Sequence, residues 1–362
     1  MQERIEAHDF PSSVYLVGEK GEIVFQDALG LAAVAPDRIE ATLDTIYDLA
    51  SLTKPLVTGL LAALLVQDGV LTLNGRVADH FSGAKAGLSA VSLQQLLTHT
   101  SGLPAWRPFY LLADSPEQVL ERILATEPEP SAGVVYSDLN FILVAAIIEA
   151  ASGKGLAEIA TRKIFEPLGL NDTFFNPPTK LFGRIAASEL GNEYEKRTCI
   201  EQGYINGAEA ETSGKFRDYL IRGEVHDGNA YFMGGAAGHA GLFSTAADVF
   251  RIALQFLPDH TTLWGPETCQ LFRTNYTKGM NEDRSIAFQL ASTADSTAGP
   301  DLPSEAFGHN GFTGTSLWID TVNERVFILL TNRTHAHPLP FVNINSVRRR
   351  FHSLAVTALN EI

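Results

Sequence analysis

The chain has 362 residues, of which 45% are hydrophobic and 19% are charged, and its formal net charge is −15. A chain this acidic repels phosphate backbones, which argues against a nucleic-acid partner, and its length allows one large domain or two lobes with a sizeable core. Two cysteines, Cys199 and Cys269, are too few for a disulfide framework, and the sequence leaves open whether they pair.

The N-terminal segment shows no basic region followed by an apolar run, so we expect no secretory signal and assign the chain as given to the cytoplasm. A leader removed beforehand would place the protein in the periplasm or outside the cell instead. The longest apolar runs, 59–66 and 141–148, fall short of the about 20 residues that cross a bilayer. They predict buried helices and no membrane span.

The chain opens with two strand-like runs at 13–18 and 22–30, and the short turn between them predicts an antiparallel hairpin. Helical patterns dominate the middle of the chain, at 53–68, 92–99, 115–127, 140–152 and 155–169.

Residues 175–235 are Gly-rich and weakly periodic, which predicts long loops of the kind that often carry function. Beyond them, Thr245 and Asp248 have the spacing of a helix N-terminal cap. Strands return at 314–321 and 325–332 as a second hairpin, and a final helix is expected at 344–359.

Strands at both ends with helices between them predict two lobes. The first, built from 1–60 and 285–362, is mixed α/β with an antiparallel sheet flanked by helices. The second, at 61–284, is an inserted, mostly helical lobe with long loops. We expect the active site between them.

The segment SLTKP places Ser51 three residues before Lys54, at the start of an apolar helix. Pro55 has no amide hydrogen and fits only the first turn of a helix, so Ser51 lies at the helix start. Residues i and i+3 share a helix face, which brings the lysine within reach of the serine hydroxyl. The pattern is typical of an activated serine nucleophile, although a helix-capping serine has the same local signature.

Two later motifs favour the chemical interpretation. Tyr136, Ser137 and Asp138 precede an apolar helix, and His309-Asn310-Gly311 leads into a strand. Together with LLTHTSGLP (96–104) and GHAGLFST (238–245), the order of these motifs resembles the serine β-lactamase and penicillin-binding protein superfamily, and within it the class C β-lactamase-like branch with its esterases and D-aminopeptidases.

The resemblance implies a β-lactamase/transpeptidase-like fold and an acyl-enzyme mechanism without metal or organic cofactor. Ser51 would be the acylated nucleophile, and Lys54 and Tyr136 would share the proton transfers. The oxyanion hole would consist of the backbone amides of Ser51 and Phe312. Which of Lys54 and Tyr136 acts as base stays open at this point.

Two positions depart from the family pattern, and both belong to the implied substrate-binding set of Asp138, His309, Asn310 and Gly311. Asp138 stands where an asparagine would donate a hydrogen bond to the substrate, and it can pair with Lys54 instead. His309 replaces a lysine that binds a carboxylate, so we expect a site without a fixed positive charge, in which His309 gains a proton as the pH falls toward 6.

These departures predict hydrolysis of a carboxylic ester or a D-amino-acid amide, as a small-molecule or peptide substrate. One alternative is a D,D-peptidase or weak β-lactamase, and another is an inactive homologue that binds peptidoglycan-like ligands. His99 and His239 are interpreted as structural, and His335 and His337 as surface loop residues, because two histidines without a third ligand do not make a metal site. The oligomeric state does not follow from the sequence.

Overall fold

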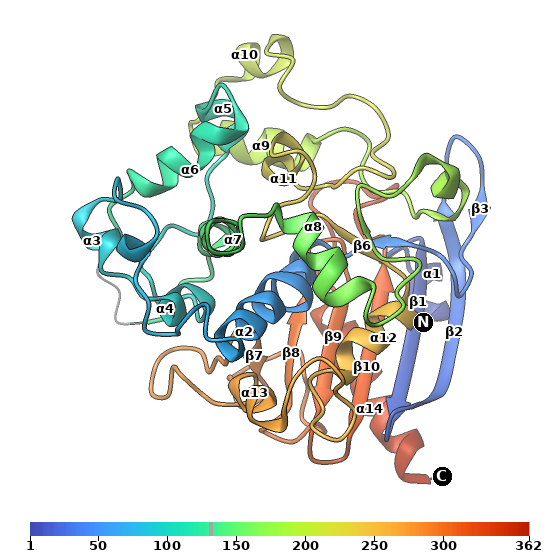
Figure 1. Ribbon diagram of the computed structural model, residues 1–362. Coiled ribbons are helices and arrows are strands. Elements are labelled where there is room, and N and C mark those ends of the chain that lie inside the picture. Colours follow the sequence, from blue (N-terminus) through green and yellow to red (C-terminus); the bar gives the residue numbers. More distant parts are fainter. Residues whose placement is uncertain (130–132, 362) are drawn as a thin grey trace.

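The computed structural model describes residues 1–129 and 133–361, and within them a seven-stranded antiparallel sheet is built from both ends of the chain (Figure 1). The strand order is β3-β2-β1-β10-β9-β8-β7. The strands are β1 (Ser12–Glu19), β2 (Glu22–Ala33), β3 (Ile39–Glu40), β7 (Gln289–Leu290), β8 (Phe307–Asn310), β9 (Ser316–Asp320) and β10 (Arg325–Thr331). Strand β1 pairs with β10 in the middle of the sheet, so the two chain ends are joined there.

The two faces of the sheet are covered by different helices, because side chains alternate along a strand. Val326, Ile328 and Leu330 of β10 face the main core, which includes residues of α2 (Leu60–Gln67) and α12 (Ala246–Leu254). Phe327 and Leu329 face the opposite side, where they pack with residues of α14 (Asn345–Glu361).

The remaining helices lie mostly between residues 86 and 271, and those between 86 and 152 and between 193 and 232 form the helical part of the molecule at the upper left and top of Figure 1. They are α1 (Gln2–Glu6), α3 (Ala86–Ser89), α4 (Leu93–Leu97), α5 (Phe109–Leu112), α6 (Pro116–Leu124), α7 (Asp138–Ser152), α8 (Leu156–Ala160), α9 (Glu193–Glu201), α10 (Gly207–Thr212), α11 (Gly228–Phe232) and α13 (Pro266–Leu271).

A small second sheet connects the helical part to the start of the α2 segment. It consists of β4 (Tyr47–Asp48), β6 (Leu242–Ser244) and β5 (Phe174–Phe175), with β6 in the middle. The Leu49 amide extends this pairing by donating to the Leu242 carbonyl at 2.9 Å. The chain therefore enters the next helix, which begins at Ala50, from a fixed direction.

Most of the predicted elements are confirmed. The hairpins β1–β2 and β9–β10 are present, and the Thr245 side chain caps α12 by accepting from the Asp248 amide. The prediction of long loops at 175–235 was wrong in part, because the segment contains α9, α10 and α11. Cys199 and Cys269 are buried and unpaired. The lobe boundaries at 60 and 285 stay a prediction.

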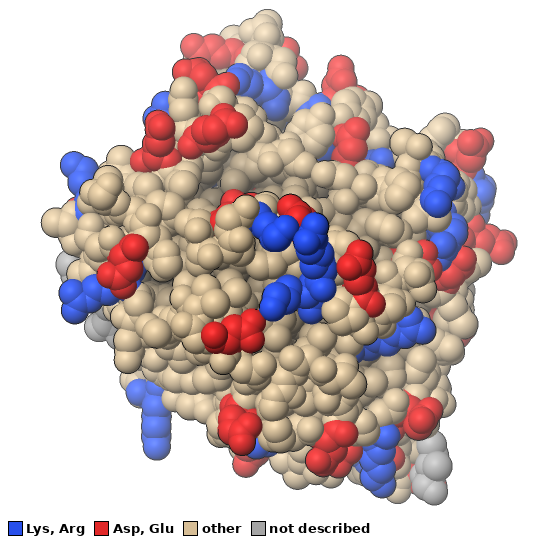
Figure 2. All heavy atoms as spheres, viewed as in Figure 1, with Lys and Arg blue, Asp and Glu red and all other residues tan. Residues whose placement is uncertain are grey.

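The two longest apolar runs are buried helices, as expected. Ala50–Gln67 has the length and composition of a membrane span, as does the bent pair Asp138–Ser152 and Leu156–Phe165, but 83% of the first segment is buried inside the fold. Figure 2 shows Lys and Arg side chains over the α8 region beside acidic ones. The ion pairs of residues 154–163 include Lys154 with Glu158 and Lys163 with Asp68.

Candidate active site

The start of the helix that carries Ser51 is fixed by a buried carboxylate. Ser51 lies in a single 3₁₀ turn, Ala50–Leu52, which continues through a π-helical turn, Lys54–Gly59, into α2. Asp48 accepts hydrogen bonds from the amides of Ala50 (2.9 Å) and His226 (2.7 Å). These bonds hold Ala50 at φ 47°, a conformation that residues with a side chain rarely adopt, directly before the serine.

The Lys54 ammonium is fully buried and is in contact with three oxygen atoms. Its Nζ donates to Ser51 Oγ at 2.9 Å and to the His239 carbonyl at 3.1 Å, and it lies 2.7 Å from Asp138 Oδ1. Burial alone would lower the pKa of Lys54, but Asp138 and, after it, Tyr136 outweigh burial and raise it. Lys54 is therefore protonated in this arrangement and has no lone pair with which to accept the serine proton.

Tyr136 and Asp138 come from the N-terminus of α7 and are held there by His99. The Ser137 amide donates to His99 Nδ1 at 3.0 Å, and the rings of His99 and Tyr136 lie 4.5 Å apart. Burial keeps the pKa of His99 well below its ordinary value, so its ring is a neutral acceptor. The Tyr136 ring in turn lies 5.0 Å from Lys54 Nζ.

The turn after β8 is clamped to the backbone just before Ser51. Thr313 Oγ1 donates to the Asp48 carbonyl at 2.7 Å, and Thr315 Oγ1 donates to the Leu49 carbonyl at 3.0 Å. A Cβ on Gly311 would stand only 2.6 Å from the same Leu49 oxygen, so a side chain there would force the two segments apart.

The clamp sets the two amides of the predicted oxyanion hole beside one cavity. Ser51 and Phe312 both line that cavity, and within the described part of the chain neither amide N–H donates to a protein acceptor. Two free amide donors next to a serine hydroxyl are the arrangement that an oxyanion requires.

Two cavities meet at Ser51, Tyr136 and Phe312. The first, which we call the acidic cavity, has a volume of about 340 Å³ and is lined by Asp138, Glu195 and Asp227 among others. The second, which we call the basic cavity, has a volume of about 590 Å³. The predicted residues His309, Asn310 and Gly311 line the basic cavity, so the predicted substrate-binding set is divided between the two.

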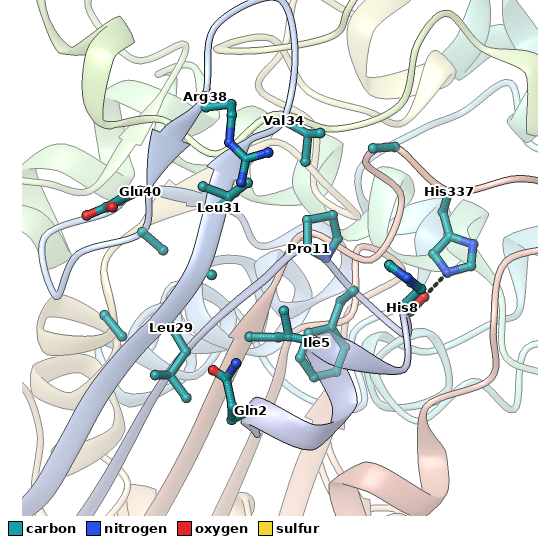
Figure 3. A pocket seen from close by; sticks show the side chains of 15 residues that line it. Gln2, Ile5, His8, Pro11, Leu29, Leu31, Val34, Arg38, Glu40 and His337 are labelled. Atoms are coloured by element: carbon teal, nitrogen blue, oxygen red, sulfur yellow. Dashed lines mark hydrogen bonds between the residues drawn. The ribbon is translucent and has the colours of Figure 1, made fainter.

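A third cavity, of about 610 Å³, shares no lining residue with these two. It lies between α1, β2 and the segment around His337 (Figure 3), where the His337 ring contacts the His8 carbonyl. No serine lines it, so we do not assign the reaction to it.

Three arginines line the basic cavity: Arg284, Arg333 and Arg348. Arg333 donates to the carbonyls of Phe312 and Val342, and Arg348 to those of Gly311 and Thr315. Burial, together with Arg333, lowers the pKa of Arg348 to about 9, which leaves it charged at neutral pH.

Arg284 is the arginine with nitrogen atoms left for a ligand. It is 2% exposed and pairs with Glu282, yet its Nε and Nη2 are buried without a hydrogen-bond partner among the described residues. Arg348 Nε is in the same condition. With Glu282 as the acidic group beside three arginines, the basic cavity has excess positive charge.

The expectation of a site without fixed positive charge was therefore wrong, and so was the expected protonation of His309 near pH 6. Burial, then Arg284 and Lys54, keep the pKa of His309 well below its ordinary value. The fixed charge comes from arginines distant in the sequence, and two of them, Arg284 and Arg348, add to the effect of burial in lowering the pKa of His309.

The remaining histidines have structural contacts. His239 Nε2 lies 2.9 Å from Asp227 Oδ1, and the backbone carbonyl of His239 accepts a hydrogen bond from Lys54 Nζ. His335 is buried, which corrects the surface interpretation: its Nε2 accepts from the Val34 amide and its Nδ1 faces the Ser188 carbonyl. No group of three or more His, Cys, Asp or Glu side chains in residues 1–129 and 133–361 is arranged to hold a metal ion.

Sequence reasoning missed Arg284, Arg333, Arg348, Glu195 and Asp227, because none of them belongs to a motif. The one available signal was the run of three arginines at 348–350 near the C-terminus, whose first member faces the basic cavity.

Comparisons with known proteins show which family and which fold this chain shares. The beta-lactamase family model matches residues 1–348. An Escherichia coli protein named "Putative D-alanyl-D-alanine carboxypeptidase" is 30% identical, over 90% of this chain and 79% of its own length. A class C beta-lactamase from Rhodobacter sphaeroides has a similar fold, with a TM-score of 0.74 at 20% identity over 100% of this chain and 98% of its own. An octameric penicillin-binding protein homologue from Pyrococcus abyssi gives a TM-score of 0.71 at 19% identity over 99% and 75% of the two chains.

The clamp predicts the effect of Gly311→Ala. The added methyl group would meet the Leu49 carbonyl at 2.6 Å and Thr315 Oγ1 at 2.0 Å. We expect a loss of about 1–3 kcal/mol in the free energy of unfolding, as is typical of overpacking, and slower reaction of Ser51 with a fluorophosphonate. Denaturant titration and labelling kinetics measure the two effects. Gly207→Ala, where nothing lies within 4 Å, is the control, and equal behaviour of the two variants would exclude the clamp.

The Lys54–Asp138 pair predicts a change in pH dependence. Asp138 raises the pKa of Lys54, so in Asp138→Asn the ammonium loses its proton at lower pH. The alkaline limb of the rate of Ser51 labelling by a fluorophosphonate, followed by mass spectrometry, should then move to lower pH. Asp68→Asn, which breaks an exposed lysine pair, is the control and should leave the limb in place. An unmoved limb in Asp138→Asn would show that Lys54 does not control it.

His309 should remain neutral across the physiological range. Because its pKa lies well below the ordinary value, its imidazole NMR signal, assigned by comparison with His309→Asn, should not titrate between pH 5.5 and 8. The unfolded protein, in which every histidine titrates, provides the control. A midpoint near 6.5 in the folded protein would mean that the arginines do not act on this ring.

Proposed function

The chain belongs to the beta-lactamase family and is a hydrolase of the serine acyl-enzyme class, and we propose that it releases a carboxylate-bearing amino acid from the end of a peptide. The observation that carries this proposal is the buried Arg284 guanidinium, which has two nitrogen atoms without a protein acceptor in the described residues and lines the cavity next to Ser51. The names of the curated relatives agree with this type of substrate.

We assign the base to Tyr136. Lys54 donates hydrogen bonds to Ser51 Oγ and to the His239 carbonyl and forms an ion pair with Asp138, so the proton of the serine must go elsewhere. The Tyr136 ring lies 5.0 Å from Lys54 Nζ, and Tyr136 lines both cavities beside Ser51, so we assign the proton exchange with the serine to its hydroxyl. In this scheme the Tyr136 oxygen takes the proton as Ser51 Oγ bonds to the peptide carbonyl carbon.

The remaining steps follow from the same groups. The carbonyl oxygen becomes negative and is bound by the amides of Ser51 and Phe312. The C–N bond then breaks, Tyr136 returns the proton to the leaving nitrogen, and the amino acid departs through the basic cavity. Water attacks the acyl-enzyme with Tyr136 again as base, which releases the shortened peptide and restores Ser51.

Asp138 has a role of its own in this scheme. Its carboxylate lies 2.7 Å from Lys54 Nζ and raises the pKa of the lysine, so it maintains a positive charge beside Ser51 and Tyr136. The serines near the site are occupied by other contacts: Ser137 Oγ donates to the Pro104 carbonyl and Ser101 Oγ to Asn140. Ser51 is the serine for which the geometry supports a nucleophilic role.

The main argument for an ester preference was that the site lacks a fixed positive charge. The three arginines supply such a charge, so that argument no longer holds. A neutral ester gains nothing from Arg284, whereas a carboxylate in the leaving group gains a charged hydrogen bond of about 1.5–3 kcal/mol. This corresponds to about 10- to 150-fold in kcat/KM.

The test compares a peptide ending in D-alanyl-D-alanine with its C-terminal amide. Wild type should hydrolyse the free acid at least about tenfold faster, and Arg284→Gln should reduce that ratio. Arg273→Gln, an exposed arginine outside the cavity, is the matched control. Hydrolysis of both peptides at equal rates, or faster hydrolysis of neutral aryl esters, would exclude the carboxylate requirement.

A fluorophosphonate should form its adduct on Ser51, located by mass spectrometry, and Ser51→Ala should abolish both labelling and hydrolysis. An adduct on Ser101 or Ser137 would refute the assigned nucleophile. Folded protein that neither labels nor hydrolyses would instead support an inactive ligand-binding homologue.

A further inference from the structure

The acidic cavity has a polarity opposite to that of the basic cavity, and the reaction proposed above gives no role to two of its carboxyl groups, Glu195 and Asp227. Its carboxylates are Asp138, Glu195 and Asp227, and no lysine or arginine is among the described residues that line it. Lys54 already neutralises Asp138 from behind the cavity wall. Glu195 and Asp227 have no ion pair with a lysine or arginine in the described chain; their neighbours are histidines, because His239 lies against Asp227 and His226, whose pKa Glu189 raises against the effect of burial, lines the same cavity as Glu195.

Glu195 has a buried oxygen that lacks a partner. The residue lies on α9 and is 7% exposed, and its Oε1 accepts from the Gly228 amide at 2.8 Å. Its Oε2 lies near the Tyr110 hydroxyl, which also contacts Cys199 Sγ at 3.4 Å, and no hydrogen bond of good geometry reaches this oxygen among the described residues. Gly228 leaves room for this oxygen, because a Cβ there would stand 2.2 Å from it. A buried carboxyl oxygen without a donor is costly unless a ligand supplies one.

Asp227 provides a charge close to Glu195. Its Oδ1 accepts from the Ala230 amide at 2.7 Å and faces His239 Nε2 at 2.9 Å. Burial opposes ionisation, but His239 and these hydrogen bonds hold the pKa of Asp227 below its ordinary value. Burial, and then the charge of Asp227, raise the pKa of Glu195 to about 7, so a cation brought between them would favour its ionised form.

The other groups around the cavity are compatible with a cationic ligand. Trp106 and Tyr194 contribute aromatic rings, whose faces attract cations. His226 is the other titratable residue beside them, and it is already paired with Glu189, with 2.8 Å between Nε2 and Oε2. The cavity therefore combines buried carboxyl groups, aromatic walls and an entrance at Ser51.

We propose that the acidic cavity binds a primary ammonium group on the acyl side of the scissile bond, with Glu195 and Asp227 as its main acceptors. This inference rests on the proposed function, which places the leaving-group carboxylate in the basic cavity and so leaves the acidic cavity for the acyl part. The preferred substrate is then a zwitterionic peptide, with its positive group before the bond that is cut and its carboxylate after it.

The experiment uses two matched pairs of peptides and one pair of probes. The peptides are D-Ala-D-Ala and its N-acetyl form, and Nα-acetyl-L-Lys-D-Ala-D-Ala and its Nα,Nε-diacetyl form. In at least one pair, wild type should favour the free amine about tenfold or more in kcat/KM. Fluorophosphonates with an amino-ended and an acetamido-ended tail test the same preference as the rate of Ser51 labelling, without requiring peptide cleavage.

Two variants on α9 distinguish a binding role from a structural one. Glu195→Gln should reduce the preference for the amine toward unity while the acetylated peptide and the acetamido probe react much as before. Glu193→Gln removes an exposed carboxylate that pairs with Arg197 on the same helix, and it should keep the full preference. If Glu195→Gln does not fold, the comparison of the paired substrates in wild type still decides the question.

The outcomes separate this inference from the proposed function. Labelling of Ser51 with no preference for the amine in any pair would overturn the ammonium site and leave the hydrolase assignment intact. A preference that survives in Glu195→Gln would overturn the role of Glu195. Absence of labelling by either probe would refute the nucleophile itself, and with it both proposals.

Discussion

The buried ammonium of Lys54 is the constraint on which the arrangement of the site depends. A fully buried charge is tolerated only when its surroundings supply acceptors for it. Three parts of the chain do so: the helix start with Ser51, the Gly-rich segment with the His239 carbonyl, and the start of α7 with Asp138. The acceptors meet at one nitrogen atom, so a shift of any of the three segments removes one of these contacts. The position of the nucleophile is thus determined by the same contacts that satisfy the lysine.

A chain with a net charge of −15 nevertheless has a cavity with excess positive charge beside its nucleophile. The arginines hold that charge on backbone carbonyls of the site's own turn, so they stabilise the turn and present a cationic wall with the same side chains. Across Ser51 the lining is anionic. A cleft with opposite charges at its two ends orients a dipolar substrate before any close contact forms, because a molecule entering in reverse meets like charge at both ends.

The sequence was sufficient for the parts of the site that lie within a few residues of one another. Ser51 and Lys54 share a helix turn, and Pro55 marks where that turn begins, so their contact follows from helix geometry alone. Arg284 and Glu195 could not be predicted in this way, because what matters about them is burial and the lack of a partner, and both arise from packing between distant segments. The protonation state of His309 was predicted wrongly for the same reason, because it depends on burial and on charges brought close by packing. The helix α10 is different, since its capping box of Asn206 and Glu209 was visible in the sequence.

The clamp between the β8–β9 turn and the residues before Ser51 joins positions more than 260 apart in the chain. One amide of the oxyanion hole comes from each side of this contact, so neither the first 300 residues nor the final strands alone contain a reactive centre. During synthesis the serine therefore emerges long before the group that would stabilise its reaction. In the proposed mechanism the complete oxyanion hole therefore requires the pairing of β8 to β10 with β1, which joins the two ends of the chain.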